Sequence, residues 1–356
     1  MTGFALYRLP HATHAIFVQQ TQGQPDELLS CQELNGRQGF VMAPFEITPS
    51  QPILLIHPDV VQTVGLSMKE IGSLAPFPLA NSDVQSTRHV GGNRMTYAID
   101  FASFHSQLSL GTFQKIVLAR CADEPLEKPV SPEELFLRAC ERYPRMMIAL
   151  MWTAKSGCWL MATPEILLEG EGNAWRTIAL AGTMRLEGES LKGEGESATW
   201  SVKNIQEQRI VTTYITECLE QYTSDFREEG PHTVRAANLV HLRSDFTFTL
   251  PDGGRIGDLL YTLHPTPAVC GLPKRETFNF ITHNEHAPRR YYSGFMGMLD
   301  PNHKTHLYVS LRCMNIEADC CHLYAGGGLL KDSTEEQEWN ETEAKLETMR
   351  YVLQQR

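Results

Sequence analysis

The sequence of 356 residues has no apolar run long enough to span a bilayer. Its first residues, "MTGFALYRLPHATHAIFVQQ", lack the basic start and long apolar stretch of a secretory signal. Positive charge is also scarce, since 31 Lys and Arg face 42 Asp and Glu and give a formal net charge of −11. Such a chain repels nucleic acid and anionic lipid. We therefore expect a cytoplasmic protein that binds neither nucleic acid nor membranes, and whose small anionic ligands need a basic pocket or a metal ion.

Paired cysteine spacings are missing as well. The nine cysteines include the adjacent Cys320 and Cys321 but no C-x-x-C, so the spacing indicates neither a zinc site nor a disulfide framework. We expect most of them to be small buried apolar side chains. The chain also lacks internal repeats, while its 42% of hydrophobic residues and its length are enough for a large core. It should fold.

Apolar periodicity predicts regular structure from about residue 97 onward. Helical spacing indicates helices over 97–114, 132–143 and 201–223, and an acidic helix follows residue 333. Apolar runs between polar or glycine-containing turns predict strands over 115–120, 146–152, 158–164, 165–170, 175–183, 241–250, 291–299, 306–316 and 320–330. Meandering strands with helices in between are typical of an α+β protein with large antiparallel sheets.

The stretch "DSTEEQEWNETEAK", residues 332–345, combines a buried helix stripe with acidic side chains. If Trp339 begins that stripe, then Glu338, Glu341 and Lys345 share the neighbouring edge of the helix. Two carboxylates three residues apart can hold a hard cation such as Mg²⁺. A solvated helix face is the alternative.

The remaining charges of this stretch suggest capping and solvation. Ser333 or Thr334 is expected to cap the helix, with an acid or amide three residues on completing a capping box. Glu335, Glu336 and Glu343 are interpreted as solvated charge.

Three further polar residues stand beside apolar stretches. Lys115 opens "KIVLAR", where desolvation by apolar neighbours would suit a base, unless it is a strand-end lysine reaching solvent. Glu165 follows the strand break "TP" and is either a proton donor or a loop charge. Glu207, in "KNIQEQ", borders the apolar stripe of its helix and could supply another metal carboxylate or remain on the surface.

A run of three glycines lies in "LYAGGGLL", residues 323–330. Glycines between a strand and a helix start expose backbone N–H groups that can hold a carboxylate or a phosphate. A tight turn without a ligand is the alternative.

These motifs occur together and in one order. From about residue 100 to its end, the sequence resembles the chorismate-utilising enzymes, and among them the isochorismate synthases. The matching motifs are "KIVLAR", "TPEILL", "LAGTMR", "KNIQE", "LHPTPAVCGLPK", the pattern E-x-x-x-R-x-x-Y-x-G-x-x-G from Glu285 to Gly297, "VSLRC", "LYAGGGLL" and "EWNETEAK". The resemblance implies antiparallel sheets packed face to face with helices outside. Residues 1–95 match little and are expected to complete the fold of a catalytic core at 96–356, within one structural domain.

The resemblance also implies chemistry. Chorismate, a dicarboxylate, would bind with Mg²⁺ on its ring carboxylate, held by Glu207, Glu338 and Glu341. Lys115 would activate water for attack at C2, and Glu165 would protonate the departing C4 hydroxyl. Acid and base on opposite sides of a ring suit such a reaction without a redox cofactor.

Substrate contacts are implied at several further positions. They are Gly182, Thr183, Tyr292, Arg312, Gly326, Gly328 and Lys345. Among them, Arg312 can take a carboxylate bidentately. His264, in "HPTP", is either a substrate contact or a structural histidine. Gln208 and Asn204 depart from the His and the acidic residue that the family often has there, so the metal geometry is expected to differ.

The branch within the family follows from two positions. Ala181 stands where some aminodeoxychorismate synthases carry an attacking lysine, and "HPTPAVCGLPK" differs from the P-x-G-x-x-x-G-A-P-K of anthranilate and salicylate synthases. Ala181 argues only against a covalent lysine route, because anthranilate synthases share it, whereas "HPTPAVCGLPK" together with Lys115 favours water over ammonia as the nucleophile. We therefore expect an isochorismate synthase that needs no amidotransferase partner and is a monomer or weak homodimer. Salicylate synthase, anthranilate synthase component I and a non-catalytic anion-binding protein remain alternatives. "KNIQE" leans towards menaquinone rather than siderophore biosynthesis.

Overall fold

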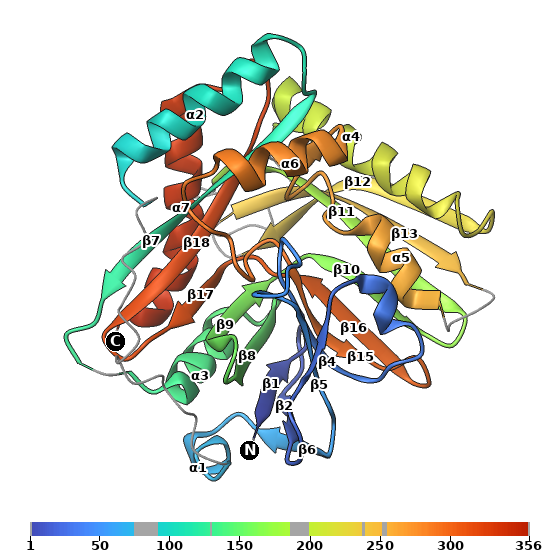
Figure 1. Ribbon diagram of the computed structural model, residues 1–356, viewed down its shortest axis with the longest axis vertical. Helices are drawn as coiled ribbons and strands as arrows, with labels where there is room; N and C mark the ends of the chain where they lie inside the picture. Colours follow the sequence, from blue (N-terminus) through green and yellow to red (C-terminus); the bar gives the residue numbers. More distant parts are fainter. Residues whose placement is uncertain are drawn as a thin grey trace.

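The computed structural model describes residues 2–74, 92–128, 130–185, 199–236, 239–250 and 255–354. Within these residues the chain forms two antiparallel sheets of nine strands each, with helices around them (Figure 1). The predicted α+β class with large antiparallel sheets is therefore confirmed.

The two sheets are built from strands that are far apart in the sequence. Sheet A has the order β14 (Gly271–Leu272), β7 (Lys115–Pro125), β18 (Cys320–Leu329), β17 (Cys313–Ile316), β9 (Gly157–Thr163), β8 (Met147–Thr153), β1 (Gly3–Arg8), β2 (His14–Gln20) and β6 (Val60–Gly65). Sheet B has the order β12 (Phe226–Ala236), β13 (Leu239–Thr249), β11 (Ala174–Arg185), β10 (Ile166–Glu171), β16 (Lys304–Val309), β15 (Phe295–Leu299), β4 (Gly39–Ala43), β5 (Ile53–Ile56) and β3 (Asp26–Leu28).

Alternation along the strands creates the core between the sheets. In β8, Met147, Ala149 and Met151 join the cluster that contains inward residues of both sheets, whereas Ile148 and Leu150 face the outer side of sheet A. Successive strand residues point to opposite faces, so one strand supplies two apolar layers. The sheets thus pack face to face.

Helices cover the outer faces. They are α1 (Met68–Ile71), α2 (Arg94–Ser109), α3 (Pro132–Arg142), α4 (Val202–Leu219), α5 (Ile256–Leu263), α6 (Lys274–Asn284) and α7 (Glu335–Leu353), and a short 3₁₀ turn spans Cys31–Leu34. The α3 and α7 helices contribute to the outer apolar cluster of sheet A, and α4 packs on β11 of sheet B. No described helix combines the length and apolar composition that a membrane crossing requires.

The first 65 residues enter both sheets. β1 pairs with β8 in sheet A, and β4 pairs with β15 in sheet B. Residues 75–91, which precede the predicted boundary at residue 95, lie outside the described part of the chain. The division at that boundary stays a prediction.

Several strand and helix predictions are confirmed, and one strand is wrong. Residues 306–316 form two strands rather than one, because β16 belongs to sheet B and β17 to sheet A. Continuous apolar character hid the turn between them. The sequence patterns also missed β12, α5 and α6.

The start of α7 differs from its predicted capping box. Thr334 is the N-cap residue but makes no side-chain capping hydrogen bond, and Ser333 Oγ instead accepts from the N–H of Leu330 at 3.0 Å. Glu343 is not merely solvated either, because it forms ion pairs with Arg120 and Arg350. Both side chains contact residues that are distant in the sequence or outside the predicted motif, and the sequence pattern does not reveal such contacts.

Candidate active site

Two chain crossings between the sheets lie side by side. The chain leaves sheet A at Glu165, between β9 and β10, and returns to it at Arg312, between β16 and β17. The N–H of Val309 donates to the Glu165 carbonyl at 2.9 Å, and the N–H of Ala162 donates to the Arg312 carbonyl at 3.0 Å. Arg312 has a φ of 44°, a left-handed conformation that permits its sharp turn. A buried acid and a buried guanidinium are thereby placed together.

The Glu165 carboxyl lies inside the molecule among positive charges. Its side chain is buried, with the residue only 3% exposed. Burial raises its pKa from 4.5 to about 8, although the positive charges of Arg312, Lys115 and Lys345 act in the opposite direction. The alternative of a simple loop charge is therefore wrong, because the side chain lies inside the molecule among cations.

Lys115 and Glu207 form a buried ion pair. Lys115 is 0% exposed at the start of β7, and its Nζ lies 2.9 Å from Glu207 Oε1. The other carboxylate oxygen accepts the N–H of Gly182 at 3.2 Å. Burial raises the pKa of Glu207, but Lys115 and the nearby lysines outweigh it and lower the pKa below its ordinary value. The alternatives of a strand-end lysine that reaches solvent and of a surface glutamate are therefore wrong for Lys115 and Glu207.

Gly328 makes room for this pair. A Cβ atom at Gly328 would lie 2.2 Å from Glu207 Oε1 and 2.7 Å from Lys115 Cε. Both distances are below van der Waals contact, so any side chain at this position would push the ion pair apart. The three glycines lie within β18 and pair with β7, so the tight turn that the sequence suggested is wrong, and the lack of a side chain at Gly328 leaves room for the ion pair.

Glu338 and Glu341 converge on the same strand. Glu338 is buried at 1% exposure, so a solvated helix face is wrong for this residue. A Cβ atom at Gly327 would lie 3.2 Å from Glu338 Oε2 and 3.7 Å from Glu341 Oε1, which places both oxygens against this backbone. Lys345 Nζ lies 2.7 Å from Glu341 Oε1 and donates to the Gly326 carbonyl at 2.8 Å.

Lys203, which the sequence patterns did not single out, lies beside the predicted metal carboxylates. It pairs with Glu338 from the first turn of α4. Burial lowers its pKa, but the carboxylates of Glu338, Glu341 and Glu207 reverse the shift and raise the pKa. One ammonium thus stands among three carboxylates that come from two helices. Its position four residues before Glu207, on the same helix face, was the available signal.

Glu207, Glu338 and Glu341 have the donor chemistry of a site for a hard divalent cation, although among the described residues their oxygens do not converge to within 4.8 Å of one another and each carboxylate is paired with a lysine. All three predicted ligands offer oxygen, the donor that Mg²⁺ prefers. The Oε2 atom of Glu338 is buried and has no hydrogen-bond partner among the described residues. Burial and the neighbouring Glu341 raise the pKa of Glu338, which Lys203 only partly offsets. A cation bound at this point would give Glu338 Oε2 a partner and would lower the pKa of Glu338.

A neutral histidine links the Arg312 side chain to β11, and the sequence did not single it out. His241 Nδ1 lies 3.1 Å from the Gly182 carbonyl, and His241 Nε2 lies 3.1 Å from Arg312 Nη2. A carbonyl only accepts and a guanidinium only donates, so Nδ1 carries the proton. Burial and the positive charge of Arg312 hold the pKa of His241 well below 6.5. Thr183 Oγ1 lies 3.3 Å from the same Nδ1 atom.

Tyr292 closes another side of the cluster. A Cβ atom at Gly326 would lie 2.8 Å from the Tyr292 hydroxyl oxygen. The tyrosine ring stacks on Tyr324 at a centroid distance of 5.8 Å. Gly326 and Tyr292 are therefore neighbours, as the resemblance implied.

His264 lies among other partners. Its ring packs edge-on against Phe295 at 5.1 Å, and its carbonyl accepts from Lys274 Nζ at 2.8 Å. Burial lowers its pKa to about 3, so it is neutral. Its contacts within the described chain reach neither Lys115 nor Glu165. Substrate contact by His264 stays a prediction, and the geometry agrees with the structural alternative.

The two departures from the family pattern have structural roles. The buried Gln208 amide donates to the Ala179 carbonyl at 3.1 Å and to Ser244 Oγ at 3.3 Å, which fastens α4 to sheet B. Asn204 packs against Gly182, where a Cβ atom would lie 3.1 Å from the Asn204 Cβ.

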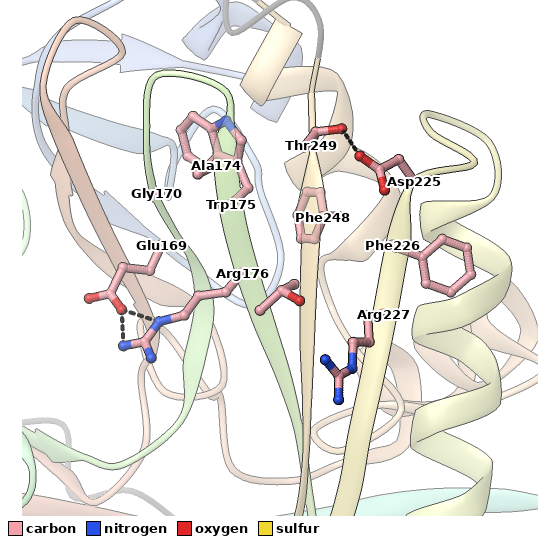
Figure 2. Close-up of a pocket in the computed structure, with 11 residues that line it drawn as sticks. Glu169, Gly170, Ala174, Trp175, Arg176, Asp225, Phe226, Arg227, Phe248 and Thr249 are labelled. Atoms are coloured by element: carbon pink, nitrogen blue, oxygen red, sulfur yellow. Dashed lines mark hydrogen bonds and ion pairs between the residues drawn. The ribbon is translucent and has the colours of Figure 1, made fainter.

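A separate cavity lies at the edge of sheet B. It has a volume of about 470 Å³ between the β10–β11 hairpin and the β12–β13 pair (Figure 2). Trp175 and Phe248 line it together with the Glu169–Arg176 ion pair and the hydrogen bond from Thr249 to Asp225. None of the predicted site residues lines this cavity, so it is not where the acid, the amine and the carboxylates meet.

Comparison with known proteins agrees with this geometry. The family profile described as "Chorismate binding enzyme" matches residues 48–354. The "Salicylate biosynthesis isochorismate synthase" of Pseudomonas aeruginosa is 32% identical over 257 residues, which cover 70% of this chain and 52% of that protein. "Isochorismate synthase EntC" of Escherichia coli K12 is 26% identical over 313 residues, covering 87% of this chain and 79% of that protein. The chain thus spans about half the length of the first relative.

Solved structures share the fold. The putative 2,3-dihydroxybenzoate-specific isochorismate synthase DhbC from Bacillus anthracis superposes with a TM-score of 0.81 at 20% identity, covering 99% of this chain and 96% of that one. At this identity the superposition is a statement about architecture alone.

Proposed function

The chain belongs to the family of chorismate binding enzymes, and from this premise we propose that it is an isochorismate synthase, an isomerase that converts chorismate to isochorismate. The observation that carries the proposal is the buried position of the Glu165 carboxyl among the positive charges of Arg312 and Lys115, where burial raises its pKa to about 8. Addition of water and loss of hydroxide need an acid and a base in one pocket. The names of the curated relatives support the same reaction.

The proposed reaction uses two proton transfers. Lys115, as the neutral amine, accepts a proton from water as the water oxygen bonds to C2 of the ring, and Glu207 then pairs with the resulting ammonium. The ring double bond shifts as the C4–O bond breaks, and Glu165 gives its proton to the departing hydroxyl, which leaves as water. Atoms balance because one water enters and one leaves, so the product is an isomer of the substrate. Neither a redox cofactor nor a covalent intermediate is required.

Basic groups of the pocket would bind the two carboxylates of the substrate. Arg312 is oriented by His241 and can form paired hydrogen bonds to one carboxylate. Lys345, whose Nζ is held by Glu341 and the Gly326 carbonyl, adds positive charge. These cations explain how a chain of net charge −11 can attract a dianion.

We propose Mg²⁺ as the cofactor, held by Glu207, Glu338 and Glu341. When bound, Mg²⁺ would neutralise the ring carboxylate of the substrate and fix its orientation. The bound ion would compete with Lys203 for the Glu338 carboxylate, so we expect Mg²⁺ to displace the Lys203 ammonium from this ion pair.

Product analysis tests the proposal. The full chain is incubated with chorismate and Mg²⁺, and the products are separated and identified by mass and absorbance. Isochorismate is the expected product, with no need for ammonia or a second protein. Salicylate with pyruvate as the main product would assign the salicylate synthase branch, and ammonia-dependent anthranilate would assign anthranilate synthase component I. Chorismate binding without any product would contradict an enzymatic role.

The use of the product is a finer proposal. "KNIQE" supports menaquinone biosynthesis ahead of siderophore biosynthesis. A strain deprived of this protein should lose menaquinone, measured in its lipid extract. Loss of a catecholate siderophore with unchanged menaquinone would reverse the assignment.

A further inference from the structure

A second group of ligand-type side chains lies on the same two strands as the active site. Cys121 and Asp123 are two residues apart on β7, so they share one face of that strand. His322 of β18 is the direct cross-strand partner of Asp123. The thiol sulfur, a carboxylate oxygen and a ring nitrogen all lie within 4.8 Å of one another. Cys121 is six residues beyond Lys115, or roughly 20 Å along the strand.

The separations between these atoms suit a tetrahedral metal ion. Cys121 Sγ lies 4.0 Å from Asp123 Oδ1, and His322 Nδ1 lies 2.7 Å from that oxygen. Bonds of ~2.3 Å to sulfur and ~2.0 Å to nitrogen and oxygen place tetrahedral ligands roughly 3.3–3.5 Å apart. One observed separation is slightly longer than this and the other slightly shorter. A small rotation of the Asp123 side chain, which is 26% exposed, would bring both into range.

The other ring nitrogen of His322 has an orienting partner. His322 Nε2 lies 3.5 Å from Glu317 Oε2. A metal-bound imidazole typically donates its second N–H to a carboxylate, which fixes the ring and increases its basicity as a ligand. Here Nδ1 faces Cys121 and Asp123 while Nε2 faces Glu317, so a metal ion would replace the proton between Nδ1 and Asp123 and leave the Glu317 contact in place.

Donor chemistry selects the kind of metal. One thiolate, one imidazole and one carboxylate suit Zn²⁺ and disfavour Mg²⁺, which takes oxygen ligands. Cys121 is fully buried and His322 is nearly so, whereas Asp123 reaches solvent and offers an entry route. Burial raises the pKa of the Cys121 thiol, so metal binding must displace a proton.

We propose that Cys121, Asp123 and His322 bind a Zn²⁺ ion that ties β7 to β18, with Glu317 orienting His322. The three protein ligands leave the fourth tetrahedral position to water. This site is separate from the carboxylate cluster in both place and donor type. It does not depend on the proposed reaction, because it is built from none of the residues that carry it.

Cobalt titration of the full chain tests the proposal. Excess Mg²⁺ is kept present so that the carboxylate cluster does not contribute. One Co²⁺ per chain should bind and produce a near-ultraviolet thiolate-to-cobalt absorption band, which Zn²⁺ should abolish by competition. Affinity should rise with pH, since the thiol gives up its proton. Absence of the band at one Co²⁺ per chain would overturn the proposal.

Variants locate the ligands. Cys121→Ser should lose the band, whereas the matched control Cys140→Ser, another buried cysteine, should keep it. Asp123→Asn serves as a second variant at a partly exposed position, in case Cys121→Ser does not fold, and circular dichroism reports folding for each. A band that persists in folded Cys121→Ser or is unchanged in Asp123→Asn refutes this ligand set.

Discussion

The pair β7 and β18 carries two polar clusters of opposite chemistry towards its two ends (Figure 1). At the Lys115 end, oxygen donors and lysines alternate around Gly326–Gly328, and each predicted metal carboxylate has a lysine close by. Towards the other end, Cys121, Asp123 and His322 offer sulfur, oxygen and nitrogen, and His322 lies between the carboxylates of Asp123 and Glu317. Exchangeable lysine pairs suit a site that must admit a charged substrate, whereas a compact mixed-donor site suits a permanent ion.

The largest expected effect is at Lys115. Lys115→Ala should lower kcat by roughly 10²–10⁴-fold, because general base catalysis contributes about that much. Chorismate should still bind, as measured by calorimetry. The exposed lysine variant Lys304→Ala is the control and should retain activity. A fully active, folded Lys115→Ala protein would remove this residue from the mechanism.

Two neighbouring glycines face different parts of the candidate site. Gly328 faces the Lys115–Glu207 ion pair, and Gly327 faces the carboxylates of Glu338 and Glu341. Gly328→Ala places a Cβ atom 2.2 Å from Glu207 Oε1 and should lower kcat by roughly 10²-fold, the scale of a misplacement of about 1 Å. Gly327→Ala meets Glu338 Oε2 at 3.2 Å and should instead raise the Mg²⁺ concentration needed for half-maximal activity, with a smaller loss of kcat. Steady-state kinetics at several Mg²⁺ concentrations measures both. Equal effects of the two substitutions would contradict the distinction.

At the other end of the strands, the expected effect is on metal affinity. Glu317→Gln should weaken Zn²⁺ binding by roughly 10–100-fold, because it removes the carboxylate that orients His322. Competition titration with a chromophoric chelator gives the affinity. Glu171→Gln, at an exposed glutamate of β10, is the control. An unchanged affinity would exclude the orienting role.

The smallest expected effect is a decrease of kcat/KM at alkaline pH. Glu165 must be protonated to act as an acid, so kcat/KM should fall about tenfold per pH unit above its pKa of about 8. The residual activity of Glu165→Gln should lack this decrease, which separates it from effects of other groups. A wild-type profile that is flat to well above pH 8 would show that Glu165 is not the acid.

The same raised pKa predicts a stability change. Folding favours the protonated carboxyl, so its contribution is complete below about pH 4.5 and is lost as pH rises towards about 8. The difference in unfolding free energy between wild type and Glu165→Gln should shrink across that range. Chemical denaturation at several pH values measures it.

Local sequence patterns predicted much of the fold, because buried apolar residues recur at a regular spacing along helices and strands. The helices at 132–142 and 202–219 and the strands β7, β8, β9 and β18 follow from apolar spacing, and the Ser131 side chain caps α3 by accepting from the N–H of Glu134. The break between β16 and β17 was missed because the apolar run through residue 311 gives no sign of a change of sheet. The α5 helix has only 8 residues, and α6, although it is as long as α3, buries only Thr277 and Ile281, so its apolar periodicity is weak.

The sequence by itself determined the chemical types available: one lysine opening a strand, one glutamate after a strand break, carboxylates spaced on helices, and glycines at one strand end. It could not decide which charges are buried, because composition alone favoured a solvated face for Glu338. Tertiary structure decided that by bringing residues of α4 and α7 together beside the glycines of β18, so that Lys203 pairs with Glu338 and the missing side chain of Gly328 leaves room for Glu207. It also placed His241 against Arg312, and His322 against Asp123, since cross-strand register and sheet packing, rather than distance along the chain, set these contacts.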